Sequence, residues 1–230
     1  MPLPGPLKNL LRGQRGGSGA GGAPPGVFRR SAPDEPEIVS TRRSRALEEF
    51  FLDIRGQSGL TILDLGGASQ ENVNFITSLG HRLYSEDFLQ ILQETFGGED
   101  TVDQSNPGRI EFFMGQALDY PEDYFDGVLL WDALEYLTPA LLQAVVTRIH
   151  KIARQKGQML AFFESDDKLE TVPCYTFRIL ELSSLQLTQR GARRPVQLFN
   201  NRGLEKLFAD FQSVKFFLTR ERLREVLVRV

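Results

Sequence analysis

The chain has 230 residues, of which 41% are apolar and 25% charged, so it has the composition of a globular protein and can bury a sizeable core. One cysteine and two histidines exclude a disulfide framework and a cysteine-rich zinc site, and we expect no metal site. The net charge of −3 is uneven: residues 1–45 hold eight Lys or Arg and three Asp or Glu, a net of +5, which leaves an acidic body of −8 and argues against nucleic acid as a partner.

Residues 1–37 are rich in Gly, Pro, Ser and Arg and contain the run GGSGAGGAPPG. Such a segment cannot bury enough apolar surface to offset the entropy lost on ordering, so we predict a disordered tail over 1–37 and a single domain over 38–230. No apolar run approaches the ~18 residues that a membrane-spanning helix needs, and the N-terminus lacks the apolar core of a signal peptide. We therefore expect a cytoplasmic protein without a membrane partner.

From residue 40 onward, stretches with helical spacing alternate with short apolar runs that are typical of strands. The spacing over 40–54 predicts a helix, with Ser40 or Thr41 as its cap. The other expected helices cover 69–79, 88–96, 139–154 and 200–211. The expected strands cover 62–65, 81–86, 109–114, 124–131, 157–163, 214–218 and 226–230.

The alternation of strands and helices indicates a parallel sheet with right-handed crossovers, and thus a doubly wound α/β fold. The link between the last two strands, TRERLRE, is too short to hold a crossover helix, so those strands should pair antiparallel. The elements together predict a mostly parallel, seven-stranded sheet with a terminal antiparallel strand pair. Residues 165–199 are less regular, and we expect either a hairpin or a helix-plus-strand cover there.

The segment around the end of the first strand, DLGGASQ at 64–70, is the first candidate site. Gly66 and Gly67 stand where the chain must turn sharply, and small residues there let backbone N–H groups approach a ligand. A helix that starts near Ser69 would point its positive end at the same place. The residues alone leave two interpretations open, a nucleotide-type cofactor site and an ordinary strand-to-helix turn.

Two segments resemble the class I S-adenosylmethionine-dependent methyltransferases: DLGGAS at 64–69 and ALDYPEDYFDGVLLWDALEYLTP at 117–139. The resemblance covers roughly residues 40–230. It implies a Rossmann-like methyltransferase fold with S-adenosyl-L-methionine as the cofactor, and a transferase that methylates N, O or S of an unidentified, small-molecule substrate. Residues 165–199 would then cover the substrate. Neither the acceptor nor the oligomeric state is specified by any motif.

The resemblance also implies which residues contact the cofactor. A second glycine of the family motif is replaced by Ala68 and a third by Gln70. The carboxylate that ends the second strand would bind both ribose hydroxyls, and Glu86 and Asp87 both remain open for that role, with Glu86 preferred. The full cofactor set is Asp64, Gly66, Gly67 and Ala68 at the methionine end, Glu86 or Asp87 at the ribose, Gln116 and Ala117 after the third strand, and Trp131 against the adenine.

Asp132 and Tyr136 are the candidate catalytic residues, because in this family the reacting methyl group points towards the end of the fourth strand. Asp132 would orient a proton of the acceptor, and Tyr136 would close the site against water. In the alternative interpretation, Asp132 only caps a helix and Tyr136 only packs in the core.

Two other functions remain open. The replacement of the third glycine by Gln70, together with the lack of an evident base, would fit a non-catalytic cofactor-binding or scaffold protein of the same fold. An acidic residue at the end of the second strand also suits a nicotinamide-dependent dehydrogenase, but the chain lacks the Gly-x-Gly-x-x-Gly pattern of that class.

Overall fold

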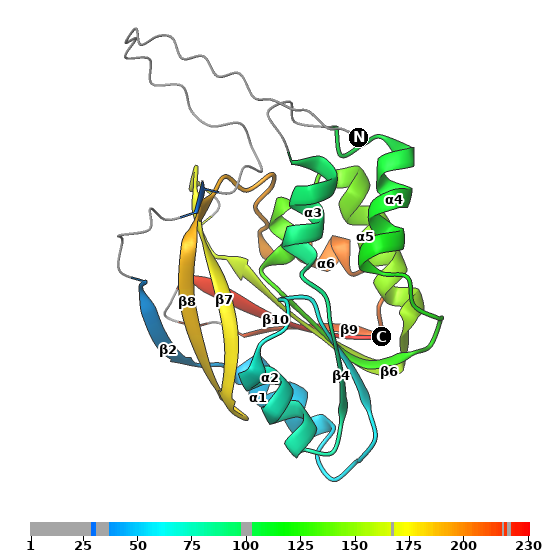
Figure 1. The fold of residues 1–230 in the computed structure, drawn as a ribbon, viewed down its shortest axis with the longest axis vertical. Coiled ribbons are helices and arrows are strands. Elements are labelled where there is room, and N and C mark those ends of the chain that lie inside the picture. The colour runs from blue at the N-terminus through cyan, green and yellow to red at the C-terminus, as the bar shows by residue number, and fades with distance from the viewer. Residues whose placement is uncertain (1–28, 31–36, 98–102, 167, 218, 220–221) are drawn as a thin grey trace, which may run out of the picture.

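The computed structural model describes residues 29–30, 37–97, 103–166, 168–217, 219 and 222–230, which form two β-sheets with helices packed on the larger one (Figure 1). The larger sheet has six strands in the order β4-β3-β5-β6-β10-β9. These strands are β3 (Thr61–Asp64), β4 (Arg82–Ser85), β5 (Phe125–Trp131), β6 (Ala153–Glu164), β9 (Ser213–Phe217) and β10 (Leu223–Arg229).

The direction of the strands follows the prediction. Strands β4, β3, β5 and β6 run parallel, whereas β10 pairs antiparallel with β6, and β9 pairs antiparallel with β10. The predicted α/β fold, with a mostly parallel sheet that ends in an antiparallel pair, is confirmed. The chain leaves β3 towards β4 on one side and later returns to β5 on the other, so the sheet has a topological switch point between β3 and β5.

The predicted strand over 109–114 is wrong, because the structure has helix α4 (Pro107–Ala117) there. The side chain of Asn106 caps the helix by accepting the Arg109 N–H at 3.1 Å, and Pro107 occupies the first turn, where a missing N–H is harmless. Phe113 and Ala117, four residues apart, both face the core. These local signals outweigh the strand preference of RIEFF, and the sheet has six strands rather than seven in the described part of the chain.

The predicted helix over 40–54 begins later than expected. Strand β2 (Val39–Arg43) comes first and pairs antiparallel with β8 (Ser184–Arg193), and helix α1 (Arg45–Asp53) follows. Ser44 caps α1 by accepting a hydrogen bond from the Leu47 N–H at 3.1 Å. The predicted caps Ser40 and Thr41 lie in β2, because pairing with β8 holds this part of the chain extended.

The smaller sheet is antiparallel and is built around a hairpin of β7 (Val172–Glu181) and β8, which we call the cover hairpin. Of the two expectations for 165–199, the hairpin is therefore confirmed. Strand β8 also pairs with β2 and with β1 (Arg29–Arg30). Strand β1 falls within the predicted tail, whereas residues 1–28 and 31–36 lie outside the described residues.

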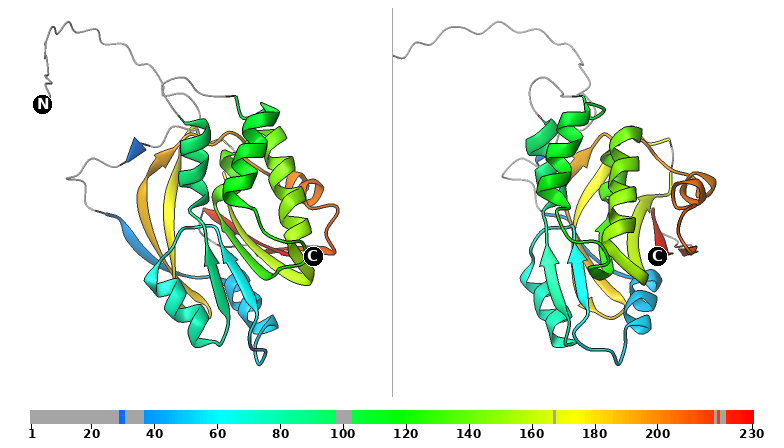
Figure 2. Two further views of the ribbon diagram at one scale, coloured as in Figure 1. Left: turned by 45° about the vertical axis from the view of Figure 1, so that its right-hand side comes forward. Right: turned by 90° about the vertical axis from the view of Figure 1, so that its right-hand side faces the viewer.

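Helices lie on both faces of the larger sheet (Figure 2), and each face carries its own apolar core. Helices α3 (Phe88–Phe96), α4, α5 (Pro139–Ile152) and α6 (Asn201–Leu207) pack on one face, against side chains such as Leu63 and Val128. Helices α1 and α2 (Gln70–Ser78) and the cover hairpin pack on the other face, against Ile62 and Leu129. No helix in the described residues is long and apolar enough to cross a membrane.

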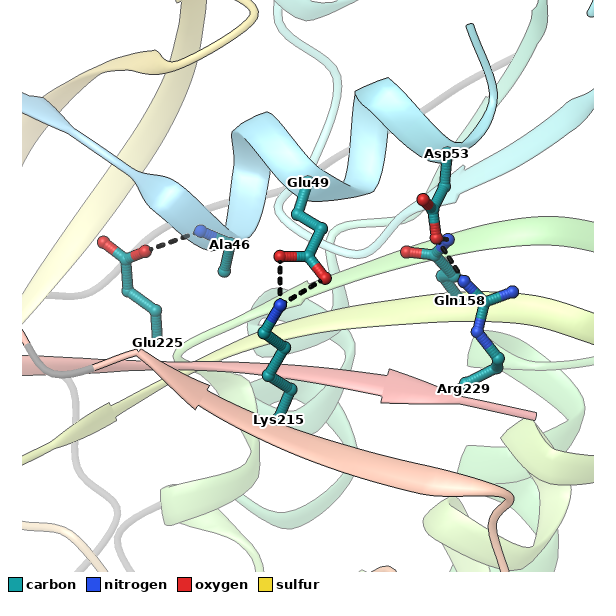
Figure 3. A network of polar contacts seen from close by, with 7 residues as sticks. All are labelled: Ala46, Glu49, Asp53, Gln158, Lys215, Glu225 and Arg229. Carbon is teal, nitrogen blue, oxygen red and sulfur yellow. Dashed lines mark hydrogen bonds and ion pairs between the residues drawn. The ribbon is translucent and has the colours of Figure 1, made fainter.

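Polar side chains fasten α1 to the antiparallel end of the larger sheet (Figure 3). Glu225 on β10 accepts the Ala46 N–H at 2.9 Å, and Lys215 on β9 donates to the two carboxylate oxygens of Glu49 at 2.7 and 2.6 Å. Asp53, at the other end of the helix, accepts hydrogen bonds from side chains of β6 and β10. The position of α1 on this face is therefore fixed at three points along its length.

Deletion of residues 1–37 should change the melting temperature by no more than about 2 °C. The described contacts that the deletion removes are the β1 pairing with β8 and an exposed ion pair between Glu37 and Arg190, and exposed ion pairs contribute about 0–1 kcal/mol. Thermal unfolding of the full and shortened chains, followed by circular dichroism, measures the difference. A much larger drop would show that the deleted segment stabilises the domain by more than these two contacts.

Candidate functional site

Residues 64–69, which we call the glycine turn, leave the carboxyl end of β3 and enter α2. The helix expected to start near Ser69 starts one residue later, and Ser69 caps it by accepting the Asn72 N–H at 3.1 Å. Gly66 and Ala68 are exposed, and Gly67 adopts a φ of +83°, a left-handed conformation that glycine takes without strain. The turn therefore presents exposed backbone beside the N-terminus of a helix.

The side chain of Asp64, the first residue of the glycine turn, lies beneath the others and is fully buried. Its Oδ1 accepts the Gly66 N–H at 2.9 Å and the Trp131 Nε1–H at 2.6 Å, and its Oδ2 accepts the Asn72 side-chain N–H at 2.8 Å. Burial raises the pKa of Asp64, and these three hydrogen bonds oppose the rise. Asp64 thus shapes the turn from below and does not reach its exposed side.

Trp131 ends β5 next to the turn and is also buried. Its ring stacks on Phe177 of β7 at 4.9 Å and on Phe162 of β6 at 6.0 Å. Its φ of +53° is rare for a residue with a large side chain, and such strain persists only where the surroundings hold it. A Cβ atom on Gly66 would lie 2.7 Å from the indole, so glycine is required there by the Trp131 ring.

Asn72 joins the glycine turn to the cover hairpin. Besides its bond to Asp64, its side chain donates to the Phe177 carbonyl at 3.2 Å and accepts the Ile179 N–H at 2.8 Å. Only 1% of Asn72 is exposed, and its buried side-chain amide is hydrogen-bonded to Asp64, Phe177 and Ile179. Gln70, the residue in the third glycine position of the family motif, is exposed and bonds to Asn74 one turn along the helix.

Of the two candidate ribose carboxylates, Glu86 lies beside the glycine turn with its side chain half-buried. Its backbone N–H donates to the Asp64 carbonyl at 2.9 Å, and its carbonyl accepts the Gly67 N–H at 3.0 Å. The Tyr120 hydroxyl donates to Oε1 of Glu86. Asp87 is exposed and caps α3, where its carboxylate accepts the Gln90 N–H at 3.0 Å.

The structure puts the other two predicted cofactor residues elsewhere than expected. Gln116 and Ala117 were expected just after a strand, but they form the C-terminal end of α4, with Gln116 exposed and Ala117 buried. The expected third strand is absent from that segment, so the reason for placing them at the mouth of the sheet no longer holds. Tyr120, three residues later, is the residue of this segment that reaches Glu86.

Asp132 and Tyr136 lie beneath the cover hairpin at the carboxyl end of β5 and are 4% and 1% exposed. Asp132 accepts the Tyr175 N–H of β7 at 3.5 Å, and the Tyr136 hydroxyl lies 3.4 Å from Sγ of Cys174. Asp132 makes no side-chain cap bond to the short helix that follows it, Ala133–Tyr136. Burial raises the pKa of Asp132 to about 6, and the backbone N–H of Tyr175 and the Arg193 guanidinium oppose that rise.

No protein-family model matches the chain, and no curated protein matches it. Among solved structures it is similar to an S-adenosylmethionine-dependent methyltransferase from Methanosarcina mazei, with 12% identity, 78% of this chain and 96% of that chain covered, and a TM-score of 0.46. A second from Clostridium acetobutylicum has 12% identity, 81% and 91% coverage and a TM-score of 0.44.

A third similar structure is the 1,6-didemethyltoxoflavin-N1-methyltransferase of Burkholderia thailandensis, which holds 1,6-didemethyltoxoflavin and S-adenosylhomocysteine. It has 13% identity, 88% and 99% coverage and a TM-score of 0.40. The family that the sequence motifs resemble is thus also present among the similar structures.

The site therefore has an open part and a closed part. The open part is the glycine turn with Glu86. The N–H groups of Gly66 and Gly67 are bonded within the protein, so this part offers exposed Ala68, the N-terminus of α2 and a carboxylate, a set suited to a polar nucleoside-type ligand. The closed part holds Asp132 and Tyr136 under the cover hairpin. Sequence reasoning missed Asn72 and Tyr120, and the only available signals were a polar residue on an otherwise apolar helix face and a tyrosine in a polar loop.

Proposed function

We propose that this chain binds S-adenosyl-L-methionine at the glycine turn and is a methyltransferase that acts on a small molecule. The observation that carries the proposal is the position of Glu86, whose backbone is hydrogen-bonded to Asp64 and Gly67 at the carboxyl ends of β3 and β4. Strand β3 borders the topological switch point, which lies between β3 and β5, and open α/β sheets bind their ligands at such a point.

The residues at the turn suit this cofactor. The exposed backbone of Gly66 to Ala68 and the N-terminus of α2 would face the carboxylate of the methionine part. Glu86 would accept hydrogen bonds from the two ribose hydroxyls. Asp64 would act through the shape of the turn, because its oxygens are already bonded to protein donors. When bound, the cofactor supplies an activated methyl group on a sulfonium.

The chain's own contribution to transfer would be positioning and the exclusion of water. Asp132 would hold or accept a proton of the N, O or S acceptor, and its carboxyl is suited to this because its pKa is raised to about 6 by burial. Tyr136 would close the site. Asp132 is buried beneath the cover hairpin, so the hairpin would act as the substrate cover within 165–199 and would have to move for an acceptor to reach Asp132.

Calorimetric titration with S-adenosylmethionine, S-adenosylhomocysteine and NAD is the direct test. We expect the first two to bind and NAD not to bind. Absence of binding by both sulfur compounds would overturn the proposal. Binding without methyl transfer to any acceptor in a broad small-molecule screen would instead support the non-catalytic alternative.

Glu86→Ala should weaken S-adenosylmethionine binding by about tenfold or more, because it removes two hydrogen bonds to a charged acceptor, each worth roughly 1.5–3 kcal/mol. Asp87→Ala is the matched control: it removes the cap of α3, at a cost of about 1 kcal/mol of stability, and should leave cofactor affinity near that of the wild type. Calorimetry on both variants measures the two constants. An effect of Asp87→Ala alone would exchange the two roles, and no effect of either would remove the cofactor from this site.

A further inference from the structure

Tyr120 contacts the proposed ribose carboxylate and is held rigidly. It lies between α4 and β5, and its backbone N–H donates to the Leu118 carbonyl at 3.0 Å. The Arg148 guanidinium of α5 donates to the Tyr120 carbonyl at 2.7 Å and to the Leu118 carbonyl at 3.1 Å. The backbone that carries Tyr120 is therefore fastened to α5 on the same face of the sheet.

The ring of Tyr120 is held as firmly as its backbone. It meets Phe125 edge-on at 4.8 Å and Tyr84 edge-on at 5.9 Å, and it stacks on Tyr124 at 6.4 Å. The hydroxyls of Tyr84 and Tyr124 bond to each other at 2.6 Å. Within this aromatic cluster, Tyr120 is thus the member whose hydroxyl is directed at Glu86.

We infer that Tyr120 is a positioning residue for the cofactor: its hydroxyl orients the Glu86 carboxylate so that the other oxygen faces the vicinal hydroxyls of a ribose. This inference rests on the proposed function. A glutamate side chain loses rotamer freedom when a ligand fixes it, so a carboxylate that is already oriented binds at a smaller entropic cost. A hydroxyl that donates to a carboxylate makes a short, strong bond, which suits this task.

The same contact keeps Tyr120 protonated. Burial and the neighbouring Glu86 carboxylate both raise the pKa of Tyr120, so its hydroxyl remains a donor well above neutral pH. Glu86 therefore always has this partner, whether or not a ligand is bound. The orientation of the carboxylate is a property of the free protein.

The test compares Tyr120→Phe with Tyr124→Phe, which removes a hydroxyl from the same cluster without touching Glu86. Calorimetry should give S-adenosylmethionine affinity about three- to tenfold weaker for Tyr120→Phe and close to wild type for Tyr124→Phe. In a Glu86→Ala background, Tyr120→Phe should have no further effect, because the residue acts through Glu86. Wild-type affinity in Tyr120→Phe, or an equal loss in both backgrounds, would overturn the inference.

A measurement without cofactor separates this inference from the proposed function. Urea denaturation of the wild type, Tyr120→Phe, Glu86→Ala and the double variant should show that the two single losses of stability do not add, because the two side chains are bonded to each other. If the wild type fails to bind S-adenosylmethionine, the proposed function fails, and this double-mutant cycle still tests the contact. Non-additive losses then uphold Tyr120 as the orienting partner of Glu86, and additive losses overturn it.

Discussion

Replacement of Glu225 by glutamine should lower the free energy of unfolding by about 3–5 kcal/mol, the range for breaking a buried ion pair. Glu225 is fully buried and accepts hydrogen bonds from Arg42 at 2.9 Å, from the Ser44 hydroxyl at 3.0 Å and from the Ala46 N–H at 2.9 Å. Glutamine keeps the size of the side chain but removes the negative charge that accepts the hydrogen bond of the buried Arg42 guanidinium. Urea denaturation at neutral pH measures the change.

The ion pair between Lys215 and Glu49 provides the control, because it joins α1 to the same end of the sheet but is exposed. Lys215→Ala should cost no more than about 1 kcal/mol. A loss for Glu225→Gln as small as that of the control would mean that Arg42 moves to solvent, and that strand β2 is not anchored through this pair.

Asp132→Asn should lower turnover by about 10²-fold or more, the range for a positioned acid–base group, while cofactor affinity stays unchanged. The same variant should be more stable than the wild type at neutral pH. Burial raises the pKa of Asp132 in the folded chain from 3.8 to about 6, so ionisation of the buried carboxyl opposes folding. This rise of the pKa corresponds to about 3 kcal/mol.

The stability difference should depend on pH in one direction. The stability that protonated Asp132 contributes is fully present below about pH 4 and is lost as the pH rises through about 6. Asparagine cannot ionise, so the advantage of the variant should grow between these values and then level off. Denaturation across this range tests the stability, and assays with an acceptor in hand test the turnover. Unchanged turnover would remove Asp132 from the chemistry, and a difference independent of pH would contradict its buried ionisation.

The elements that could be predicted are those whose ends are set by neighbouring residues. Ser69 begins α2 and the 88–96 helix has the predicted bounds, because caps and apolar spacing act within one or two turns. The prediction failed at 109–114, where residues that favour strands compete with the helix cap at Asn106 and with the apolar pair Phe113 and Ala117. It also failed at 40–43, where pairing with residues about 145 positions away decides the conformation.

The candidate site was predictable in outline but not in its contacts. The glycine turn and the choice between Glu86 and Asp87 were read from the sequence, yet only the structure shows that Asp87 caps α3. Asn72 could not be recognised, because its partners on β7 lie more than 100 residues away. The turn can be predicted from neighbouring residues, whereas the role of Asn72 cannot, because it depends on a strand that is distant in the sequence.

The three side-chain bonds of Asn72 have a thermodynamic consequence. The cover hairpin cannot leave α2 without breaking the bonds of Asn72 to Phe177 and Ile179, and the same amide holds Asp64 beneath the glycine turn. Movement of the hairpin away from α2 therefore weakens the contacts that hold the glycine turn. Conversely, a more rigid turn raises the free energy needed to move the hairpin. Such linkage is reciprocal: if the proposed cofactor binds at the turn and an acceptor under the hairpin, each would change the affinity for the other by the same factor.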